Sequence, residues 1–285
     1  QFHDDILKEL HLRHELLQAS SIVYRPMVVP PELHTMVASG GYLHTGMRKP
    51  VVQRFKSNYF GAEGKEQRFS TPSLEVLEGL NALMLTEWCI NKRVRVVMET
   101  MFENNIGLAN LPLYSFEEFM YNEPYPNDGD KVDRAIWCQK RQEAWSDWYK
   151  SEQARARMLV RLRLAKDMED WEYFWHVYTL DFRGRAYTVC ELLSPQSSDL
   201  DRGLIMMANA KKVDERGRYW LKVNLANLFD MDKISLDERV QWVDDNWEMF
   251  ERIAEDPYSN KEWIDSAKKK NKSFQRLASI FDITR

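Results

Sequence analysis

The stretch YTLDFRGRAYTV, residues 178–189, is the most informative part of the sequence for the fold. Asp181 stands first and Gly184 fourth in a four-residue segment that suits a type I turn, because an aspartate side chain can accept backbone N–H groups and glycine tolerates the exit geometry. β-Branched and aromatic residues flank the turn on both sides, as is typical of strands. The stretch therefore predicts a β-hairpin with Arg183 and Arg185 at its tip.

Two interpretations of this tip stay open from the residues alone. Two guanidinium groups beside Tyr187 suit a phosphate backbone with a stacked base or sugar, since arginine offers a planar fork of donors. Alternatively, Asp181 pairs with one arginine and the tip is a structural clasp. Arg183 and Arg185 share side-chain parity on an extended backbone, but the turn breaks it, so the relative direction of the two arginines is not fixed by the sequence.

Composition limits the classes of protein that the chain can belong to. With 44% hydrophobic residues and ten tryptophans, its 285 residues can bury a core. The net charge of −4 argues against coating nucleic acid or membrane by bulk attraction, so any anion site must be local. No apolar run approaches the roughly 18 residues of a membrane span, and three separated cysteines indicate reduced thiols. We expect a soluble, cytoplasmic protein.

Helical periodicity dominates the rest of the chain. Residues 24–52 are rich in proline and glycine and predict an irregular connector. The periodicity predicts a helix at residues 2–17, one long helix from Thr71 to about Asn105, and one or two helices over 131–169. It also predicts two helices separated by a turn over 203–229, and an amphipathic helix over 239–255. The expected fold class is mainly α with a small β element, that is, α+β.

Residues 150–166 carry six basic side chains against one acidic one, Glu152. A solvated helical face is the ordinary explanation of such a run. A basic helical stripe can also track a phosphate backbone.

A resemblance to a known family bears on the role of the hairpin tip and on the role of the basic run at residues 150–166. The segment LDFRGRAYTVCELLSPQSSDLDRGLIMMA, residues 180–208, resembles the D-x-x-G-R region of the phage-type single-subunit RNA polymerases, which include mitochondrial RNA polymerase. YWLKVNLANLFDMDKISLDERVQWVDDN, residues 219–246, resembles the insertion within the palm of that family. RPMVVPP, GGYLHTGMRKP and LTEWCINKRV resemble blocks that precede the thumb. The matching blocks run in order from about residue 22 to residue 285.

The resemblance implies a partial right-hand polymerase. The divisions it implies are an N-terminal helical region at 1–109, thumb-like helices at 110–170, a first palm segment at 171–210 and a helical region like the palm insertion at 211–285.

The resemblance also implies roles for individual residues. Asp181, Gly184 and Arg185 fall on the motif whose arginine contacts the template strand and the RNA–DNA hybrid. Tyr187, Arg183 and Arg202 fall on nucleic-acid contacts of the same region. Lys233 falls on a lysine placed near the triphosphate of the incoming nucleotide. The run that includes Arg155 and Arg161 falls on the thumb, which grips the hybrid.

Some elements of the family's active centre have no counterpart in the sequence. Nucleotidyl transfer in this family resembles the two-metal scheme, with two aspartates holding Mg²⁺ ions. The D-x-x-x-S-G-x-Q-H segment, the fingers R-x-x-x-K helix and the H-D turn between apolar strands do not occur. We therefore expect a subunit of a split bacteriophage polymerase, with no catalytic residue or metal ligand of its own and inactive in isolation. A second chain is then expected to supply the fingers, the catalytic aspartates and Mg²⁺.

The expected partners are that second subunit, template DNA, the RNA product and nucleoside triphosphates. A single-strand-binding or activator protein is expected to assist promoter opening, and the expected setting is the bacterial host cytoplasm. Three alternatives remain: a fragment of a full-length polymerase, a non-catalytic DNA-binding transcription regulator, and a self-sufficient enzyme with Asp181, Asp199 or Asp201 as metal ligands. For these aspartates, helix capping and salt bridging is the preferred interpretation.

Overall fold

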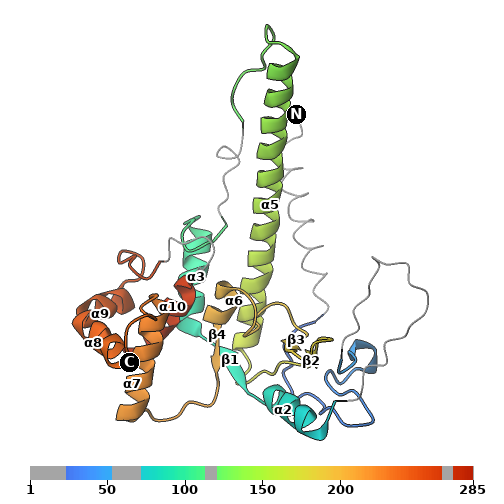
Figure 1. The fold of residues 1–285 in the computed structure, drawn as a ribbon, viewed down its shortest axis with the longest axis vertical. Helices are drawn as coiled ribbons and strands as arrows, with labels where there is room; N and C mark the ends of the chain where they lie inside the picture. The colour runs from blue at the N-terminus through green and yellow to red at the C-terminus, as the bar shows by residue number, and fades with distance from the viewer. Residues whose placement is uncertain (1–23, 53–71, 113–120, 265–271, 285) are drawn as a thin grey trace.

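The computed structural model describes residues 24–52, 72–112, 121–264 and 272–284 (Figure 1). Its elements in chain order are η1 (Thr45–Met47), α2 (Leu74–Met84), β1 (Trp88–Ile90), α3 (Lys92–Glu103), α5 (Lys131–Glu169), β2 (Tyr178–Leu180), β3 (Ala186–Thr188), α6 (Asp199–Leu204), β4 (Ile205–Met207), α7 (Glu215–Leu228), α8 (Leu236–Asp245), α9 (Trp247–Glu255) and α10 (Ser273–Ile283). The strands form two small antiparallel sheets, β1–β4 and β2–β3. The expectation of a mainly helical chain with a small β element is confirmed.

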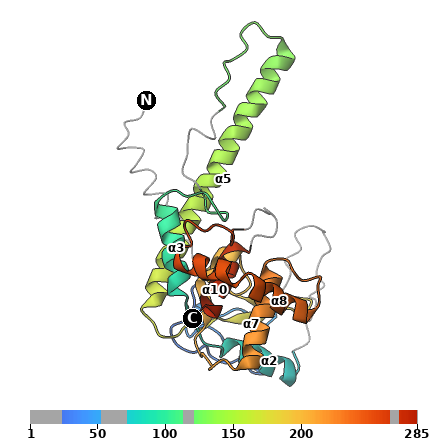
Figure 2. The ribbon, with the colours of Figure 1, turned by 90° about the vertical axis from the view of Figure 1, so that its left-hand side faces the viewer.

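Helix α5 is one unbroken helix of 39 residues, so of the one or two helices expected over 131–169 the structure has one. A capping box begins it. The Asp130 carboxylate accepts the N–H groups of Val132 and Asp133, at 2.7 and 2.9 Å, and the Asp133 side chain accepts the N–H of Asp130 at 3.3 Å. All buried residues of α5 lie between Ala156 and Met168. The first half of the helix therefore projects from the body as an arm (Figures 1 and 2).

The prediction of one long helix over 71–105 was wrong, because the structure contains α2, β1 and α3 there. Strand β1 pairs with β4 in the register Trp88↔Met207 and Ile90↔Ile205, and Trp88 also exchanges two 2.9 Å backbone hydrogen bonds with Phe174. After the strand, the Asn91 side chain accepts the N–H of Val94 at 3.3 Å and starts α3. Pairing with distant residues therefore overrides the local helical periodicity.

Two other helix boundaries also differ from expectation. The segment after Gly203 was expected to be helical, but α6 ends at Leu204 and residues 205–207 form β4. The helix predicted over 239–255 is two helices, α8 and α9, that meet at Asn246. The side chain of Phe250, in α9, is fully buried. The helix expected at 2–17 and Thr71, the expected start of the long helix, lie outside the described residues.

The β2–β3 hairpin is supported along both of its edges. On the β2 side, the N–H of Leu180 donates to the carbonyl of Val51 at 2.6 Å. On the β3 side, the Gln196 amide accepts the N–H of Thr188 and donates to the carbonyl of Ala186, both at 2.8 Å. The side chain of Gln196 thus occupies the place of a neighbouring strand, and the backbone groups of the short hairpin are satisfied.

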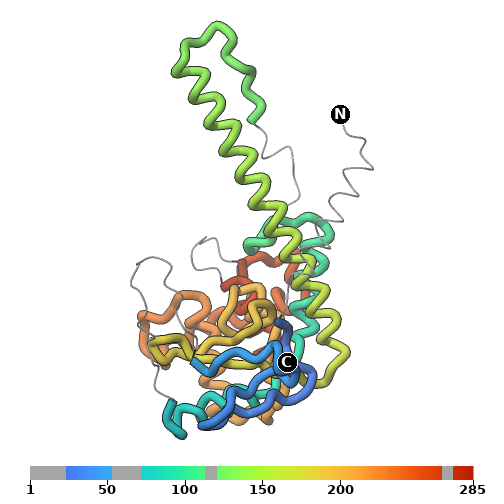
Figure 3. The backbone as a smooth tube through the Cα atoms, turned by 90° about the vertical axis from the view of Figure 1, so that its right-hand side faces the viewer, coloured from blue at the N-terminus to red at the C-terminus, as the bar shows by residue number. Residues whose placement is uncertain are grey.

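Two hydrophobic clusters hold the described residues together. The larger cluster joins residues of α3, the second half of α5, and α6 to α10, with Trp263, Phe250 and Phe274 fully buried. Gly203 permits close contact between α6 and α10, since a Cβ atom there would lie 2.6 Å from the Cβ of Phe274. The smaller cluster lies beneath the hairpin and contains residues of the 24–52 connector, α2 and β2. Figure 3 shows the connector running beside the hairpin segment.

The thiols of Cys89, Cys138 and Cys190 are free. Among the described residues, no helix is long and apolar enough to cross a membrane.

Candidate nucleic-acid interface

Asp181 organises the tip of the hairpin. Its N–H donates to the carbonyl of Arg185 at 2.8 Å, and its own carbonyl accepts the N–H of Gly184 at 3.0 Å. Gly184 has a φ of +79°, a conformation that glycine adopts without strain, so the glycine requirement inferred from the sequence is explained. This arrangement matches a hairpin loop of three residues that ends in a left-handed residue.

The Asp181 carboxylate binds both arginines of the loop. One oxygen, Oδ1, accepts the backbone N–H groups of Arg183 and Arg185, each at 2.9 Å. The other, Oδ2, accepts the Nε of both side chains, at 3.3 and 3.2 Å. The two guanidinium groups, whose relative direction the sequence left open, therefore converge on a single oxygen. Both features considered for the tip are present: a clasp centred on Asp181, and two arginines gathered side by side.

Both arginine side chains of the tip remain accessible to solvent. The exposed fraction is 58% for Arg183 and 53% for Arg185, against 18% for Asp181. The guanidinium carbon of Arg185 lies 5.7 Å from the ring centre of Tyr187, which is itself 42% exposed. Tyr187 and then Asp181 raise the pKa of Arg185, which is thus firmly cationic. An exposed aromatic ring and two convergent cations are the elements that bind a phosphate next to a base or sugar.

His34 supports the hairpin from below, a role that the sequence did not indicate. Its Nδ1 accepts the N–H of Gly40 at 3.0 Å, so the ring proton resides on Nε2, which donates to the carbonyl of Tyr178 at 2.9 Å. Burial lowers the pKa of His34, and the Tyr178 carbonyl opposes that shift only in part. A neutral histidine therefore links the 24–52 connector to strand β2.

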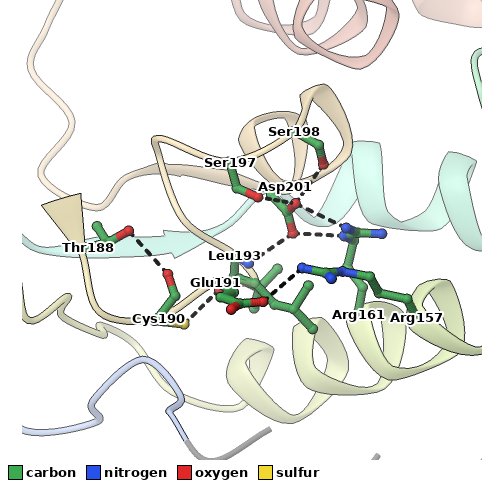
Figure 4. Close-up of polar contacts among 10 residues, drawn as sticks. Arg157, Arg161, Thr188, Cys190, Glu191, Leu193, Ser197, Ser198 and Asp201 are labelled. Carbon is green, nitrogen blue, oxygen red and sulfur yellow. Dashed lines mark hydrogen bonds and ion pairs between the residues drawn. The ribbon is translucent and has the colours of Figure 1, made fainter. Parts of the chain in front are cut away.

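Arg161 does not reach the surface, contrary to the nucleic-acid role expected for it. Its Nε and Nη2 atoms bind the two carboxylate oxygens of Asp201 at 2.7 and 3.1 Å, and the side chains are 6% and 0% exposed (Figure 4). Hydrogen bonds from the N–H of Leu193 and the hydroxyls of Ser197 and Ser198 complete the shell of Asp201. Because its guanidinium is buried against Asp201, we leave Arg161 out of the candidate interface.

The same network fixes the lower half of α5 to the segment that follows the hairpin. Burial alone would raise the pKa of Asp201, but Arg161 and the hydrogen bonds outweigh burial and lower it. Nearby, Arg157 binds the Glu191 carboxylate at 3.1 Å on the surface (Figure 4). Arg155 lies over the Phe102 ring, 4.7 Å from its centre, and is half-buried. Of the basic run, Lys150, Arg157, Arg163 and Lys166 are exposed.

Asp199 caps a distant helix. Its carboxylate accepts the N–H groups of Phe274 and Gln275 at the start of α10, at 2.8 and 3.1 Å, and the Gln275 side chain at 2.9 Å. Burial raises the pKa of Asp199, with these hydrogen bonds opposing it. Asp181, Asp199 and Asp201 thus all serve in caps, turns or ion pairs, the interpretation preferred from the sequence. No group of three or more histidine, cysteine, aspartate or glutamate side chains able to hold a metal ion occurs in the described residues.

Arg202 and Lys233 lie on other elements than the hairpin. Arg202 is exposed near the end of α6, and Lys233 is exposed in the turn between α7 and α8. Within the described part of the chain, no hydrogen bond or ion pair joins either residue to the hairpin tip. The candidate interface is therefore defined by Arg183, Arg185 and Tyr187, with Asp181 and Gly184 setting the turn.

Comparisons with known proteins show what this chain is similar to. A family model described as DNA-dependent RNA polymerase matches residues 211–285. The DNA-directed RNA polymerase of Enterobacteria phage T3 is 30% identical over 254 residues, which cover 87% of this chain. T7 RNA polymerase of Escherichia phage T7 is 29% identical over the same share, and the mitochondrial enzyme of Neurospora crassa is 31% identical over 90% of this chain.

Over most of its length, the chain is homologous to phage and mitochondrial DNA-directed RNA polymerases. The family model and these relatives thus agree in describing DNA-dependent RNA polymerases, of phages and of mitochondria. The chain spans 28% of the length of the T3 and T7 polymerases and 18% of the length of the Neurospora enzyme.

Proposed function

We propose that this chain forms the part of a DNA-dependent RNA polymerase that contacts the template strand and the RNA–DNA hybrid. The observation that carries the proposal is the hairpin tip, where Arg183 and Arg185 converge on Asp181 and remain more than half exposed. Phosphate oxygens can replace Asp181 Oδ2 as acceptors for the two guanidinium groups, while Tyr187 offers a ring to a sugar or base.

Asp181 has a positioning role in this proposal. Through Oδ1 it holds the backbone of the loop, and through Oδ2 it gathers two like charges that would otherwise repel each other. The arginines are thus gathered before nucleic acid arrives, which lowers the entropy lost on binding. Three further residues are candidate contacts with nucleic acid or nucleotide: the exposed Arg202 and Lys233, and the half-buried Arg155 at the base of the arm. Of these, Lys233 is the candidate contact for the triphosphate of an incoming nucleotide.

Among the described residues, the three aspartates considered as metal ligands do not fit a catalytic Mg²⁺ site. Asp181, Asp199 and Asp201 already bind arginine side chains or backbone N–H groups, and two-metal catalysis requires carboxylates that are free to coordinate. We therefore propose that a second polypeptide supplies the fingers, the catalytic aspartates and the metal ions. Template DNA, RNA and nucleoside triphosphates are the proposed substrates and products of the pair, working in the cytoplasm of a bacterial host.

Reconstitution tests this division of labour. The purified chain is mixed with a second polypeptide that carries D-x-x-x-S-G-x-Q-H and the H-D turn, and RNA synthesis on a primed template is measured with Mg²⁺. Synthesis is expected only when both chains are present. Synthesis by this chain alone would overturn the proposal, and activity only after covalent fusion would replace the two-chain arrangement with one continuous polymerase. Binding to DNA with no synthesis in any combination would identify a transcription regulator instead.

Promoter opening can be measured with the same pair of chains. We propose that a single-strand-binding or activator protein assists it, so initiation on a pre-melted promoter should exceed initiation on the intact duplex. Equal and specific initiation on both templates would exclude such a requirement.

The role of the hairpin has its own test in the substitution Arg185→Ala. Loss of one exposed phosphate contact is expected to weaken binding of an RNA–DNA hybrid about five- to tenfold at moderate salt, and to reduce the salt dependence by about one counterion. Binding of the second chain should not change. Arg216→Ala, at an exposed position on α7, is the matched control. Equal hybrid binding by Arg185→Ala and wild type would refute the proposed contact.

A further inference from the structure

The projecting arm carries many aromatic side chains, none of which is buried. From Tyr121 to Lys150 no residue is buried, although six of these residues are aromatic: Tyr121, Tyr125, Trp137, Trp145, Trp148 and Tyr149. A solvated helix needs no tryptophans, and large apolar rings at a partly exposed surface commonly mark a binding site. The arm is visible at the top of Figure 1, and none of its residues from 121 to 150 is a buried member of either hydrophobic cluster.

Three of these rings, Tyr121, Trp137 and Trp145, line a cavity of about 360 Å³, a size suited to a small ligand. Its walls are Tyr121, Asn122, Trp137, Arg141, Ala144 and Trp145. The four α5 residues among them follow the spacing i, i+4, i+7 and i+8, so they share one face of the helix. Ala144 has no side chain beyond Cβ, and its small size leaves room between the larger neighbours.

The orientation of the walls is fixed by specific contacts. The indole N–H of Trp137 donates to the carbonyl of Glu123 at 2.9 Å, which holds the ring by its edge. Tyr125 packs against the same ring at 5.0 Å and an angle of 89°. The segment that precedes α5 is therefore attached to the helix, and the cavity is preformed by the chain itself.

Positive charge lies over the rings. The Arg141 guanidinium carbon is 5.2 Å from the centre of the Trp137 ring, and the Lys140 amine is 5.8 Å from that of Tyr121. A cationic ligand, the usual occupant of an aromatic cage, would be repelled by these two groups. A ligand that combines a flat π-system with a negative charge fits both the rings and the cations. An unpaired nucleotide has this combination, and the Asn122 amide can donate to or accept from a base edge.

We propose that this cavity, the arm pocket, binds one unpaired nucleotide of a single strand, with its base between the rings and its phosphate near Arg141 and Lys140. The site is separate from the hairpin, and its assignment to nucleic acid rests on the proposed function. The single strand is either RNA that leaves the hybrid or DNA that has been separated from its complement, and both present the same chemistry.

Filling the cavity tests the proposal. Ala144→Leu places a larger side chain between the rings and keeps a strong helix former on α5. Ala135→Leu is the matched control, because it lies nine residues away, roughly two and a half turns, on the opposite and exposed face of the helix. Both full-length variants are compared with wild type by fluorescence anisotropy. The probes are labelled 12-nucleotide RNA and DNA of one sequence, and the same oligonucleotides with abasic positions.

Ala144→Leu is expected to weaken binding of the single strand by about five- to tenfold, the effect of losing one stacked base, with Ala135→Leu unchanged. Abasic oligonucleotides should bind wild type and Ala144→Leu equally. A larger effect on RNA than on DNA would assign the pocket to the transcript, and the reverse would assign it to the separated DNA strand. Equal affinity of all three proteins, or of intact and abasic strands, would overturn the proposal. So would displacement of the probe by a proline-rich peptide, the other ligand that aromatic grooves accept.

A second substrate separates this result from the proposed function. An RNA–DNA hybrid should bind Ala144→Leu normally and Arg185→Ala weakly, whereas the single strand should show the reverse order. If only the proposal for the arm pocket is wrong, Ala144→Leu binds the single strand like wild type while Arg185→Ala still weakens binding of the hybrid. If the proposed function is wrong, Arg185→Ala binds the hybrid like wild type.

Discussion

Among single residues, Asp201 shows how a buried charge is maintained. Its carboxylate receives two hydrogen bonds from Arg161 and further ones from Leu193, Ser197 and Ser198. A buried ion pair contributes little when intact relative to apolar residues, but removal of one partner leaves a charge that nothing compensates. The network therefore helps to hold α5, beside the apolar packing of the same half of the helix, and each member depends on the others.

Arg161→Leu is accordingly expected to lower the free energy of unfolding by about 3–5 kcal/mol, because Asp201 stays buried without its cation. The double variant Arg161→Leu with Asp201→Asn should recover part of the loss. Urea denaturation measures both. Arg163→Leu, at an exposed position of the same helix, should change the free energy by less than about 0.5 kcal/mol. Additive losses in the double variant would contradict the coupling.

His176 is the second buried residue with a measurable consequence. It is fully buried between the rings of Phe174 and Trp88, with centroid distances of 5.7 and 5.9 Å, and neither ring nitrogen has a hydrogen-bond partner in the described structure. Burial lowers the pKa of His176 from 6.5 to about 4. The histidine is therefore neutral in the folded chain at neutral pH.

As the pH falls, His176 is protonated in the unfolded chain at a higher pH than in the folded chain. Its contribution therefore lowers the free energy of unfolding between about pH 6.5 and pH 4. The full loss is about 3 kcal/mol for a pKa difference of about 2.5. His176→Phe should remove this part of the pH dependence, and the exposed His44→Phe should not. Denaturation of the three proteins between pH 4 and pH 7 gives the comparison, and parallel curves for wild type and His176→Phe would count against it.

At the scale of elements, the hairpin could be predicted and several of its neighbours could not. Asp181 and Gly184 determine the turn within four residues, so the local sequence is enough to predict the hairpin. Strand β1 is different, because Trp88 to Ile90 pair with residues more than 110 positions later and also with Phe174. A periodic apolar pattern gives no information on such partners. The long helix α5 could be predicted because its start signal and its uninterrupted course are both local.

The hairpin depends on a side chain outside its strands. Gln196→Leu removes the two hydrogen bonds to Thr188 and Ala186, each worth about 0.5–1.5 kcal/mol. The amide of Thr188 should then exchange faster with deuterium, and binding of an RNA–DNA hybrid should weaken because the tip is less well fixed. Gln153→Leu, on the exposed side of α5, serves as the control. Unchanged exchange at Thr188 would show that the edge of β3 is held in another way.

At the scale of the molecule, the second half of α5 packs in the body, whereas the first half projects into solvent. Its buried residues begin at Ala156, and the ion pairs to Asp201 and Glu191 lie in the same half. The sequence indicated the basic run but not this division, since Arg161 and Arg163 are equivalent by composition. Only the packing against α6 and the segment before it separates a buried cation from an exposed one.

Proline substitutions test this division. Gln142→Pro, in the projecting half, should kink the arm with little change in the cooperative unfolding of the body, because no core contacts depend on it. Ala165→Pro, at a fully buried position, should lower the free energy of unfolding by at least about 3 kcal/mol. Thermal unfolding gives the stability, and limited proteolysis locates the kink. Equal destabilisation by the two variants would mean that the arm is part of the cooperative unit.

The cap that Asp199 provides to α10 also sets an order of events during synthesis on the ribosome. The hairpin, α5 and the Arg161–Asp201 pair can all form once residue 201 has left the exit tunnel. The carboxylate of Asp199 and the surface beside Gly203 must wait until residues 273–283 have been made, about 75 residues later. At typical rates of translation this is a delay of several seconds. The larger hydrophobic cluster therefore closes only after α10 emerges, and until then the face of α6 beside Gly203 lacks the helix that covers it in the folded chain.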